Sequence, residues 1–526
     1  MTENRFPIAG LAVAVSIATV LIHGQGQAPQ PPPVVPKSLV AKGEPVIACE
    51  NLKSVTLPNT TIDAAVVDPG NPALPASCRV TATVTHPPAD DRVKVWIGLP
   101  MTNWNGRFQG VGGGGFSGGS ANGVAQPLRA GYAAGSTDTG HDGGSGSFAL
   151  DAKGQLNWQL IRDNAYVGIH DMTVTGKALV QAFYGTAPQK SYFNGCSTGG
   201  RQGLSEAQRY PADYDGILSG APAINWPKLH NGQLWGQLVM LEANNFVPPC
   251  KFAAATAAAV EACDAIDGVK DGVIEDPPRC TFDPKALVGA AAGANCSALT
   301  EADAGVIRKI WDGPRARDGS FLWHGLPRGG AFALSATGGN PPAGQPFGIT
   351  LDWFRYFLTQ NPKWDWTTLT HATYEQLFKQ SVEQFGDVFG TDNADLGAFR
   401  KRGGRVVMWH GWADPLIYAG GSIDYYKRVQ TAAGGPAATA QFFRFFLAPG
   451  VGHCAGGAGP APTGQFDTVV KWVEEGQAPD TLTAVRRDGS GAITRSRPLC
   501  QYPLVARYKG SGSTDEAANF ECRAGF

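Results

Sequence analysis

The sequence has almost no excess of charge of either sign. Its 526 residues include 43 lysines and arginines against 44 aspartates and glutamates, for a formal net charge of -1. A protein whose main partner is a nucleic acid or an anionic membrane surface usually carries a clear positive excess. We therefore expect neither partner. The chain is 43% hydrophobic, which is enough to bury a sizeable core.

The ten cysteines include no C-x-x-C pair, so the usual spacing of thioredoxin-like redox sites and of many zinc sites is missing. Their even number and their clustering in local pairs indicate disulfides instead. Disulfides persist in oxidising compartments. The cysteines therefore predict a protein that works outside the cytoplasm.

Beyond the N-terminus no stretch is apolar enough to span a membrane. At the N-terminus, Arg5 precedes an apolar run from Ile8 to Ile22, and small and polar residues follow. We interpret 1–28 as a signal peptide and 29–45 as a proline-rich linker. A membrane anchor is the alternative, because no sharp A-x-A cleavage site is present. The prediction is a secreted or periplasmic protein with no membrane span after signal removal.

Strand and helix patterns alternate at both ends of the chain and fade in the middle. Apolar alternation and helical periodicity predict strands and helices in turn over 78–86, 93–100, 107–111, 131–136, 165–184, 192–194, 199–210 and 217–218, and again over 405–409, 422–430, 442–447 and 466–475. Residues 221–400 are rich in turns and aromatic residues, with weak periodicity. We predict an α/β domain formed by 46–220 and 401–526 and interrupted by a lid at 221–400.

The stretch Gly195 to Gly199 has the order G-x-S-x-G between a predicted strand and a predicted helix. This is the pattern of the nucleophile elbow of α/β-hydrolases, in which glycines permit a strained turn that exposes the serine hydroxyl. The pattern alone is common by chance in a glycine-rich chain, and the strand–turn–helix context makes it more specific. We predict that Ser197 is a nucleophile on an α/β-hydrolase core.

A serine nucleophile requires a histidine that accepts its proton and a carboxylate that orients the histidine. In α/β-hydrolases these follow in the order serine, acid, histidine. Asp414 in "WHGWADPLI" and His453 in "PGVGHCAGG" follow predicted strands in that order. Each alone could be an ordinary exposed loop residue, and the rival candidates, which lack this order, are His141, His410 and Asp142. We predict a triad of Ser197, Asp414 and His453.

Cys196 precedes the predicted nucleophile, and Cys454 follows the predicted base. If serine and histidine meet at hydrogen-bond distance, the two sulfurs are brought together. A Cys196–Cys454 disulfide would then tie the catalytic loops and close a loop of roughly 260 residues. Two unrelated buried thiols are the alternative.

An oxyanion hole usually takes one amide from the residue after the nucleophile and one from an earlier loop. Thr198 supplies the first amide. The glycine run "GVGGGGFSGG" supplies the second, and we favour Gly113 within the range Gly112 to Gly115. A flexible loop is the alternative for the glycine run.

These motifs resemble those of the tannase and feruloyl esterase family of secreted serine hydrolases. The similarity extends from about Cys49 to Cys522 and includes "WNGRF", "GCSTGGRQG", "YDGILSGAP", "CDAIDGVKDG", "WHGWADPLI" and "PGVGHCAGG". It implies an α/β-hydrolase core with a large inserted lid. It also implies a disulfide between the cysteines beside the nucleophile and the base. The resemblance implies three further pairs: Cys263–Cys280, Cys500–Cys522 and Cys49–Cys78. Cys250 and Cys296 are the two cysteines that then remain, so they form the fourth.

The segment "CDAIDGVKDGVIED" carries Asp264, Asp267 and Asp271 at short spacing, with glycines between them. Such oxygen donors suit a hard cation such as calcium, although the EF-hand order is missing and a solvated acidic turn is the alternative. The resemblance implies a calcium site here, with the backbone carbonyls of Val269 and Val273 as further ligands. Because the segment lies in the lid, we expect a structural calcium ion.

The predicted lid is rich in aromatic residues, most of which we expect to form its own small core. The remainder suit an aromatic substrate, because aromatic side chains stack on aromatic ligands. Arg355 in "LDWFRYF" could pair with a phenol or carboxylate of that substrate.

We predict a serine esterase that hydrolyses carboxylic esters of hydroxycinnamic or hydroxybenzoic acids, a small-molecule substrate class. A hydrolase of mono(2-hydroxyethyl) terephthalate is the alternative within the family. A non-catalytic secreted binding protein on a hydrolase scaffold is the remote alternative.

Overall fold

The computed structural model describes residues 37–293 and 295–525. The predicted signal peptide and residues 29–36 of the predicted linker lie outside this part. Within it, no helix is both long and apolar enough to cross a membrane.

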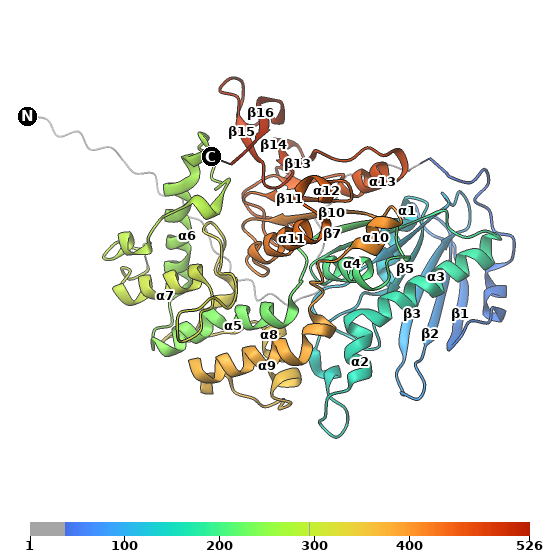
Figure 1. Ribbon diagram of the computed structural model, residues 1–526, viewed down its shortest axis with the longest axis horizontal. Coiled ribbons are helices and arrows are strands. Elements are labelled where there is room, and N and C mark those ends of the chain that lie inside the picture. Colours follow the sequence, from blue (N-terminus) through green and yellow to red (C-terminus); the bar gives the residue numbers. More distant parts are fainter. Residues whose placement is uncertain (1–36, 294, 526) are drawn as a thin grey trace, which may run out of the picture.

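A nine-stranded mixed sheet forms the centre of the molecule (Figure 1). Its strands are β1 (Thr60–Asp68), β2 (Ser77–Val84), β3 (Val93–Pro100), β4 (Arg107–Val111), β5 (Ala133–Thr137), β6 (Lys190–Cys196), β7 (Gly216–Gly220), β10 (Arg405–Gly411) and β11 (Phe443–Ala448), in the spatial order β1-β2-β3-β5-β4-β6-β7-β10-β11. The pairs from β1 to β5 are antiparallel, and those from β5 to β11 are parallel. The carboxyl ends of the parallel strands therefore share one edge, where catalytic loops of α/β sheets gather.

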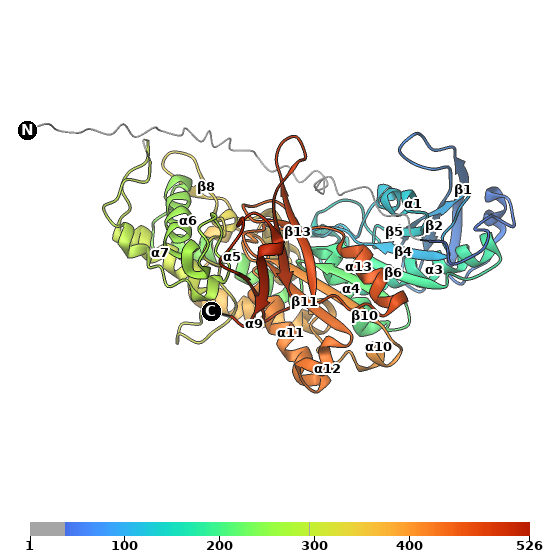
Figure 2. The same cartoon turned by 90° about the horizontal axis from the view of Figure 1, so that it is seen from above.

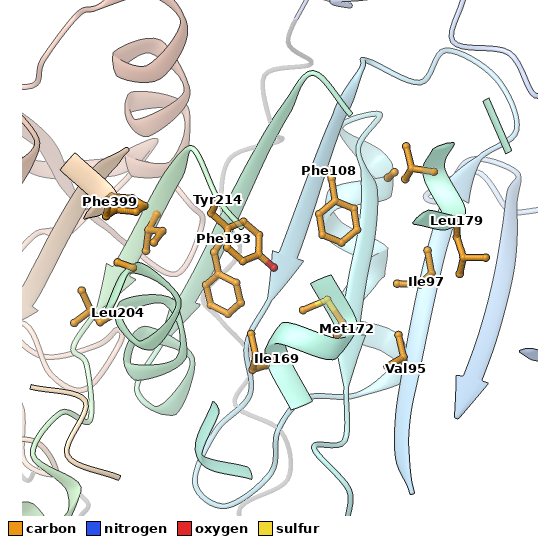
Figure 3. Close-up of a cluster of buried hydrophobic side chains, with 14 of the residues drawn as sticks. Val95, Ile97, Phe108, Ile169, Met172, Leu179, Phe193, Leu204, Tyr214 and Phe399 are labelled. Atoms are coloured by element: carbon orange, nitrogen blue, oxygen red, sulfur yellow. The ribbon is translucent and has the colours of Figure 1, made fainter. Parts of the chain in front are cut away.

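Helices cover both faces of the parallel part: α3 (Gly168–Tyr184), α4 (Thr198–Arg209), α11 (Gly420–Ala433) and α13 (Gln465–Glu475). Successive residues of a strand point to opposite faces of the sheet, so they pack in different hydrophobic clusters. Phe193 packs with Leu204 of α4, whereas Tyr192 packs with Val469 of α13. Figure 3 shows the first cluster, in which Met172 of α3 lies near Phe108 of β4. The α/β-hydrolase fold class is confirmed.

The segment between β7 and β10 forms a lobe beside the sheet (Figures 1 and 2). It contains α5 (Trp226–Glu242), α6 (Pro249–Cys263), α7 (Glu301–Asp312), α8 (Gly348–Asp352) and α9 (His371–Phe389), and α10 (Gly397–Lys401) leads back to the sheet. This part of the chain is more helical than its weak sequence periodicity indicates. Helix α5 is buried around nearly its whole circumference, so it lacks the amphipathic stripe that reveals a helix in sequence.

The C-terminal segment adds two small sheets beside this lobe. Strands β12 (Ala461–Pro462), β13 (Thr481–Arg487) and β14 (Ile493–Cys500) form one sheet, and β15 (Val505–Tyr508) and β16 (Phe520–Arg523) form a hairpin. Arg497 of β14 pairs with Asp271, and the amide of Ala506 in β15 donates to Glu275. These contacts bind the C-terminal segment to the predicted calcium segment.

All ten cysteines form disulfides, and every predicted pair is confirmed: Cys49–Cys78, Cys196–Cys454, Cys250–Cys296, Cys263–Cys280 and Cys500–Cys522.

Candidate active site

Ser197 occupies the sharp turn between β6 and α4. Its backbone has φ 63° and ψ -124°, a strained conformation for a residue with a side chain. A Cβ atom on Gly195 would lie 2.4 Å from the carbonyl carbon of Gly199, so only glycine permits this close return of the chain. The amide of Ser197 donates to the carbonyl of Gly220 at 3.0 Å, which fixes the turn against β7. The residue is half-buried, at the carboxyl edge of the sheet.

Asp414 and His453 lie in the loops that follow β10 and β11. Nδ1 of His453 is 2.8 Å from Oδ2 of Asp414. Asp414 is fully buried, and its other oxygen accepts the amides of Leu416 and Ile417, each at 2.9 Å. Burial opposes ionisation, but the facing His453 imidazole outweighs it and holds the pKa of Asp414 below its ordinary value. The carboxylate is therefore held ionised behind the imidazole, as an orienting acid requires.

The disulfide between Cys196 and Cys454 joins the loops that carry Ser197 and His453. Its Cα atoms are 6.0 Å apart, and 258 positions of sequence separate them. Ser197 and His453 are the immediate neighbours of these cysteines, so the bond holds their backbones close. Cys454 also has a positive φ of 61°, which turns the chain directly after His453.

His410, a rival base in the sequence, lies behind the acid. Its Nε2 is 2.8 Å from the carbonyl oxygen of Ile417 and 3.2 Å from Oδ2 of Asp414. Its Nδ1 is 2.8 Å from the hydroxyl oxygen of Ser422. Because both ring nitrogens are engaged and the side chain is fully buried, His410 acts as a support for Asp414 rather than as a base.

His141 and Asp142, the other rivals, form no such pair. The ring of His141 stacks on Phe148 with centroids 4.0 Å apart. Burial lowers the pKa of His141 to about 4, which leaves its imidazole neutral near pH 7. Asp142 lies in an exposed loop and provides no buried orienting carboxylate.

The glycine loop after β4 lies directly against the nucleophile turn. The hydroxyl of Thr198 donates to the carbonyl of Gly115 at 2.7 Å, and the amide of Gly199 donates to the carbonyl of Gly113 at 3.0 Å. The preference for Gly113 as an oxyanion donor is contradicted, because its own amide donates to Oε1 of Gln202 at 3.0 Å. Within the predicted range, the amides of Gly112 and Gly114 are also engaged.

The amides of Thr198 and Gly115 donate to no other group in the described part of the chain. The first amides of an α-helix have no partner inside the helix, which leaves the Thr198 amide available for an anion. Gly115 therefore replaces Gly113 as the second candidate donor.

Comparison with known proteins places these features in a family. Residues 78–523 match the model of "Tannase and feruloyl esterase". The chain is 41% identical over 486 residues to a probable feruloyl esterase of Arthroderma benhamiae, covering 90% of this chain and 88% of that one. This chain belongs to the tannase and feruloyl esterase family. It is a carboxylic ester hydrolase.

Two solved members of the family have similar structures. Feruloyl esterase B from Aspergillus oryzae superimposes with a TM-score of 0.80 at 30% identity, over 90% of this chain and 99% of that one. Tannin acyl hydrolase from Aspergillus niger superimposes with a TM-score of 0.81 at 25% identity, over 90% of this chain and 93% of that one.

In this tannase-family chain the lobe between β7 and β10, the predicted lid, packs directly on the glycine loop. Phe116, which follows the loop, stacks on Phe357 with centroids 5.4 Å apart. The side chain of Ile349 in α8 lies against Gly115. Trp353 and Phe357 are fully buried, so they belong to the lid core, as expected for most lid aromatics.

Arg355, the predicted substrate contact, is half-buried and donates from Nε to the carbonyl of Trp364 at 3.4 Å. No hydrogen bond or ion pair within the described residues joins Arg355 to the triad. Its position therefore gives no support to a role in substrate binding.

The predicted calcium segment has suitable oxygen donors, but some of these oxygens already accept hydrogen bonds from the protein. Asp264 accepts the amides of Asp271, Gly272 and Val273 at 3.0, 2.8 and 3.2 Å, and Asp271 lies 2.7 Å from Nη2 of Arg497. Three carboxylates and the carbonyls of Val269 and Val273 are a hard donor set that fits Ca²⁺. In the described conformation, however, the three carboxylates do not converge within 4.8 Å of one another.

Burial and mutual repulsion make the acidic groups of this segment hold their protons more tightly than usual. Burial and the neighbouring carboxylates of Asp271 and Asp264 raise the pKa of Asp267 to about 6. Burial raises the pKa of Glu275, with Asp267 and Asp271 adding to the shift, to about 8. A bound divalent cation would relieve this repulsion.

Three functional contacts were missed by the sequence analysis: Gln202 on Gly113, the Thr198 hydroxyl on Gly115, and His410 on Asp414. The "GCSTGGRQG" motif contains Gln202 and Thr198, but nothing in their spacing points to the glycine loop. His410 stands four residues before Asp414 in the sequence, and the sequence analysis treated it as a rival to His453 for the role of base.

Proposed function

We propose that this esterase hydrolyses esters of aromatic carboxylic acids through a Ser197–His453–Asp414 triad. The observation that carries the proposal is the buried Asp414–His453 contact, joined to the strained Ser197 turn by the Cys196–Cys454 disulfide. Support for aromatic acids comes from the relatives, whose names specify feruloyl esters.

In the first step the hydroxyl oxygen of Ser197 attacks the ester carbonyl, and Nε2 of His453 takes the hydroxyl proton. Asp414 stabilises the resulting imidazolium through Nδ1. The oxyanion of the tetrahedral intermediate accepts the amides of Thr198 and Gly115. The bond from carbon to the alcohol oxygen then breaks, and His453 gives its proton to the leaving alcohol.

The acyl-enzyme is hydrolysed by the same route. His453 takes a proton from water as the water oxygen attacks the acyl carbonyl, and it returns that proton to the oxygen of Ser197 when the bond to serine breaks. The acid is released and the enzyme is restored.

The Ser197→Ala variant tests this proposal with methyl ferulate and methyl gallate as substrates. We expect hydrolysis to fall to the background rate while the melting temperature stays that of the unsubstituted enzyme. Turnover that survives in a folded Ser197→Ala variant would refute the assignment. A parallel panel of gallate, ferulate and terephthalate monoesters separates the predicted specificity from its alternative.

We also propose a structural Ca²⁺ in the lid, held by the carboxylates of Asp264, Asp267 and Asp271 and the carbonyls of Val269 and Val273. The crowding of carboxyl groups that raises the pKa values of Asp267 and Glu275 supports it, because a divalent cation would relieve their repulsion. No catalytic step passes through this ion.

Secretion or periplasmic export is likewise proposed. The five disulfides support it, because such bonds form and persist in oxidising compartments.

A further inference from the structure

A group of metal-ligating side chains lies at the end of the nucleophile helix that is remote from Ser197. His170 comes from α3, Glu206 from the last turn of α4, and Asp213 from the turn before β7. Each offers one ligand atom, and the three atoms lie within 4.8 Å of one another. Nine residues of helix separate Glu206 from Ser197, which is about 14 Å along the helix axis. The group is therefore distinct from the catalytic centre.

Glu206 is the unusual member of this group. Its residue exposure is 1%, and neither carboxyl oxygen accepts a hydrogen bond from any residue in the described part of the chain. A buried carboxyl group without a donor is costly, so most such groups are paired or bind a metal ion. Burial and the Asp213 carboxylate raise the pKa of Glu206 well above its ordinary value. The two carboxyl groups therefore need either a shared proton or a cation between them.

His170 is held in position to share such a cation. Its Nδ1 lies 2.6 Å from Oδ2 of Asp213. Its ring stacks on the ring of Tyr210, with centroids 3.8 Å apart and an angle of 6° between the ring planes. The side chain of His170 is 30% exposed, which gives an ion a path from solvent. A ring held by stacking, beside two buried carboxylates, is a preorganised ligand set.

The backbone fixes the other two ligands to each other. The amide of Tyr210 donates to the carbonyl of Glu206, and the amide of Asp213 donates to the carbonyl of Tyr210, both at 2.9 Å. Glu206 and Asp213 thus stand on consecutive hydrogen-bonded turns. Their separation is set by the end of α4 rather than by a flexible loop.

Lys177 is a cationic side chain beside the group, and its charge lowers the pKa of Glu206. Its Nζ donates to the backbone carbonyl of Asp213 rather than to a carboxylate oxygen. Asp171, next to His170 in α3, adds further negative charge that contributes to the raised pKa of Glu206. Asp171 is itself paired with His86, whose Nε2 lies 3.2 Å from its carboxylate. Lys177 thus leaves the carboxyl groups of Glu206 and Asp213 without a direct cationic partner of their own other than His170.

We propose that His170, Glu206 and Asp213 bind a divalent transition-metal ion, Zn²⁺ or Mn²⁺, that joins α3, α4 and the turn before β7. One imidazole and two carboxylates form a mixed nitrogen and oxygen set, which these ions accept and which differs from the all-oxygen set of the predicted calcium segment. Water completes the coordination from the exposed side of His170. Binding displaces the proton that Glu206 holds in the metal-free protein.

The test uses the full chain, stripped of metal with EDTA and then returned to a buffer that contains Ca²⁺, so that the lid segment does not compete. ZnCl₂ and MnCl₂ are titrated by calorimetry, and bound metal is counted by mass spectrometry after gel filtration. We expect one tight equivalent in the unsubstituted protein and in Glu475→Gln, an exposed carboxyl on α13 that serves as the control. In Glu206→Gln and His170→Asn the affinity should fall by at least about 10-fold.

The melting temperature provides the second measurement. Added Zn²⁺ or Mn²⁺ should raise it for the unsubstituted protein and for Glu475→Gln, and should leave Glu206→Gln unchanged. Equal metal affinity in Glu206→Gln would overturn the proposal. The proposal would also be overturned if metal-free Glu206→Gln reached the melting temperature that the unsubstituted protein reaches only with metal. Glu206 would then simply share a proton with Asp213 in the unsubstituted protein.

A second cluster, His86, Asp91 and Asp163, also converges within 4.8 Å and could capture the added ion. Metal binding that is lost in Asp163→Asn and kept in Glu206→Gln would assign the ion to that cluster and reject this proposal.

Discussion

Cys196 is bonded to Cys454, and each stands directly beside one partner of the proposed proton transfer, Ser197 or His453. No other covalent link within the described chain joins these two loops. The position of the base relative to the nucleophile therefore depends on this bond as well as on the packing of the sheet.

We expect the double variant Cys196→Ala/Cys454→Ala to lose most of its kcat while still folding at low temperature, because the His453 loop gains freedom. In the chain-entropy description, closing a loop of this length stabilises the folded state by at most about 5.5 kcal/mol. The measurements are kcat with methyl ferulate at a temperature below both melting transitions, and the melting temperature itself.

The matched control is Cys500→Ala/Cys522→Ala, which removes a disulfide that spans 22 residues in the C-terminal segment. It should lower the melting temperature and leave kcat within about twofold, because that disulfide touches no catalytic loop. A similar loss of kcat in both double variants would show that the Cys196–Cys454 bond acts through stability alone.

The hydroxyl of Thr198 offers a second test, because it supports the glycine loop through the carbonyl of Gly115. Loss of a whole oxyanion donor costs about 10²–10³ in kcat. Thr198→Val keeps the shape and removes only the support, so we expect kcat to fall about 10-fold with KM nearly unchanged. Thr198→Ser, which keeps the hydroxyl, should restore kcat. Equal activity of the valine and serine variants would contradict this role.

The Asp414–His453 contact, the disulfides and the alternation of strands and helices could be predicted because they are written in short, local patterns. Gly-x-Ser-x-Gly constrains five consecutive residues, and Asp414 and His453 each follow a short apolar run that is typical of a buried strand. Because Cys196 and Cys454 stand next to Ser197 and His453, a disulfide between them predicts that the two motifs lie close together in space.

The oxyanion donor could not be predicted at the level of a single glycine. The choice between Gly113 and Gly115 depends on Gln202, whose side chain reaches across from α4 and occupies the Gly113 amide. The helices of the lid were missed for a related reason: α5 is buried on nearly all sides, and α6 is rich in alanine, so neither shows a polar face against an apolar one.

Calcium removal tests the lid segment. EGTA should lower the melting temperature of the purified protein by about 5 °C or more, and added Ca²⁺ should restore it, since an ion at 100 times its Kd stabilises the folded state by about 2.7 kcal/mol. In Asp267→Asn, Ca²⁺ should have little effect, whereas Asp318→Asn, an exposed lid residue, should respond like the unsubstituted protein. Purified protein that holds no calcium and ignores EGTA would remove the site.

His86 makes the stability of the fold depend on pH. Its Nε2 lies 3.2 Å from Asp171, and its Nδ1 lies 2.6 Å from Asp91. The hydrogen bond to Asp171, with help from Asp91, outweighs burial and raises the pKa of His86 to about 9 from the ordinary value of 6.5. The folded state thus binds this proton more tightly than the unfolded state. The stabilisation is complete below pH 6.5 and is lost as the pH rises through about 9.

The expected result is a melting temperature that falls more steeply for the unsubstituted protein than for His86→Gln between about pH 7.5 and 9.5, by about 1–3 °C. Burial raises the pKa of Asp163, the third carboxylate beside His86, to about 7, so its own titration overlaps the lower edge of this window. The slopes are therefore compared in the upper part of the window, where Asp163 is mostly ionised. Differential scanning fluorimetry in EDTA makes the measurement without metal at the His86 cluster. Parallel curves for the two proteins would mean that His86 is neutral in the folded state, and the three carboxylates around it would then have to share protons among themselves.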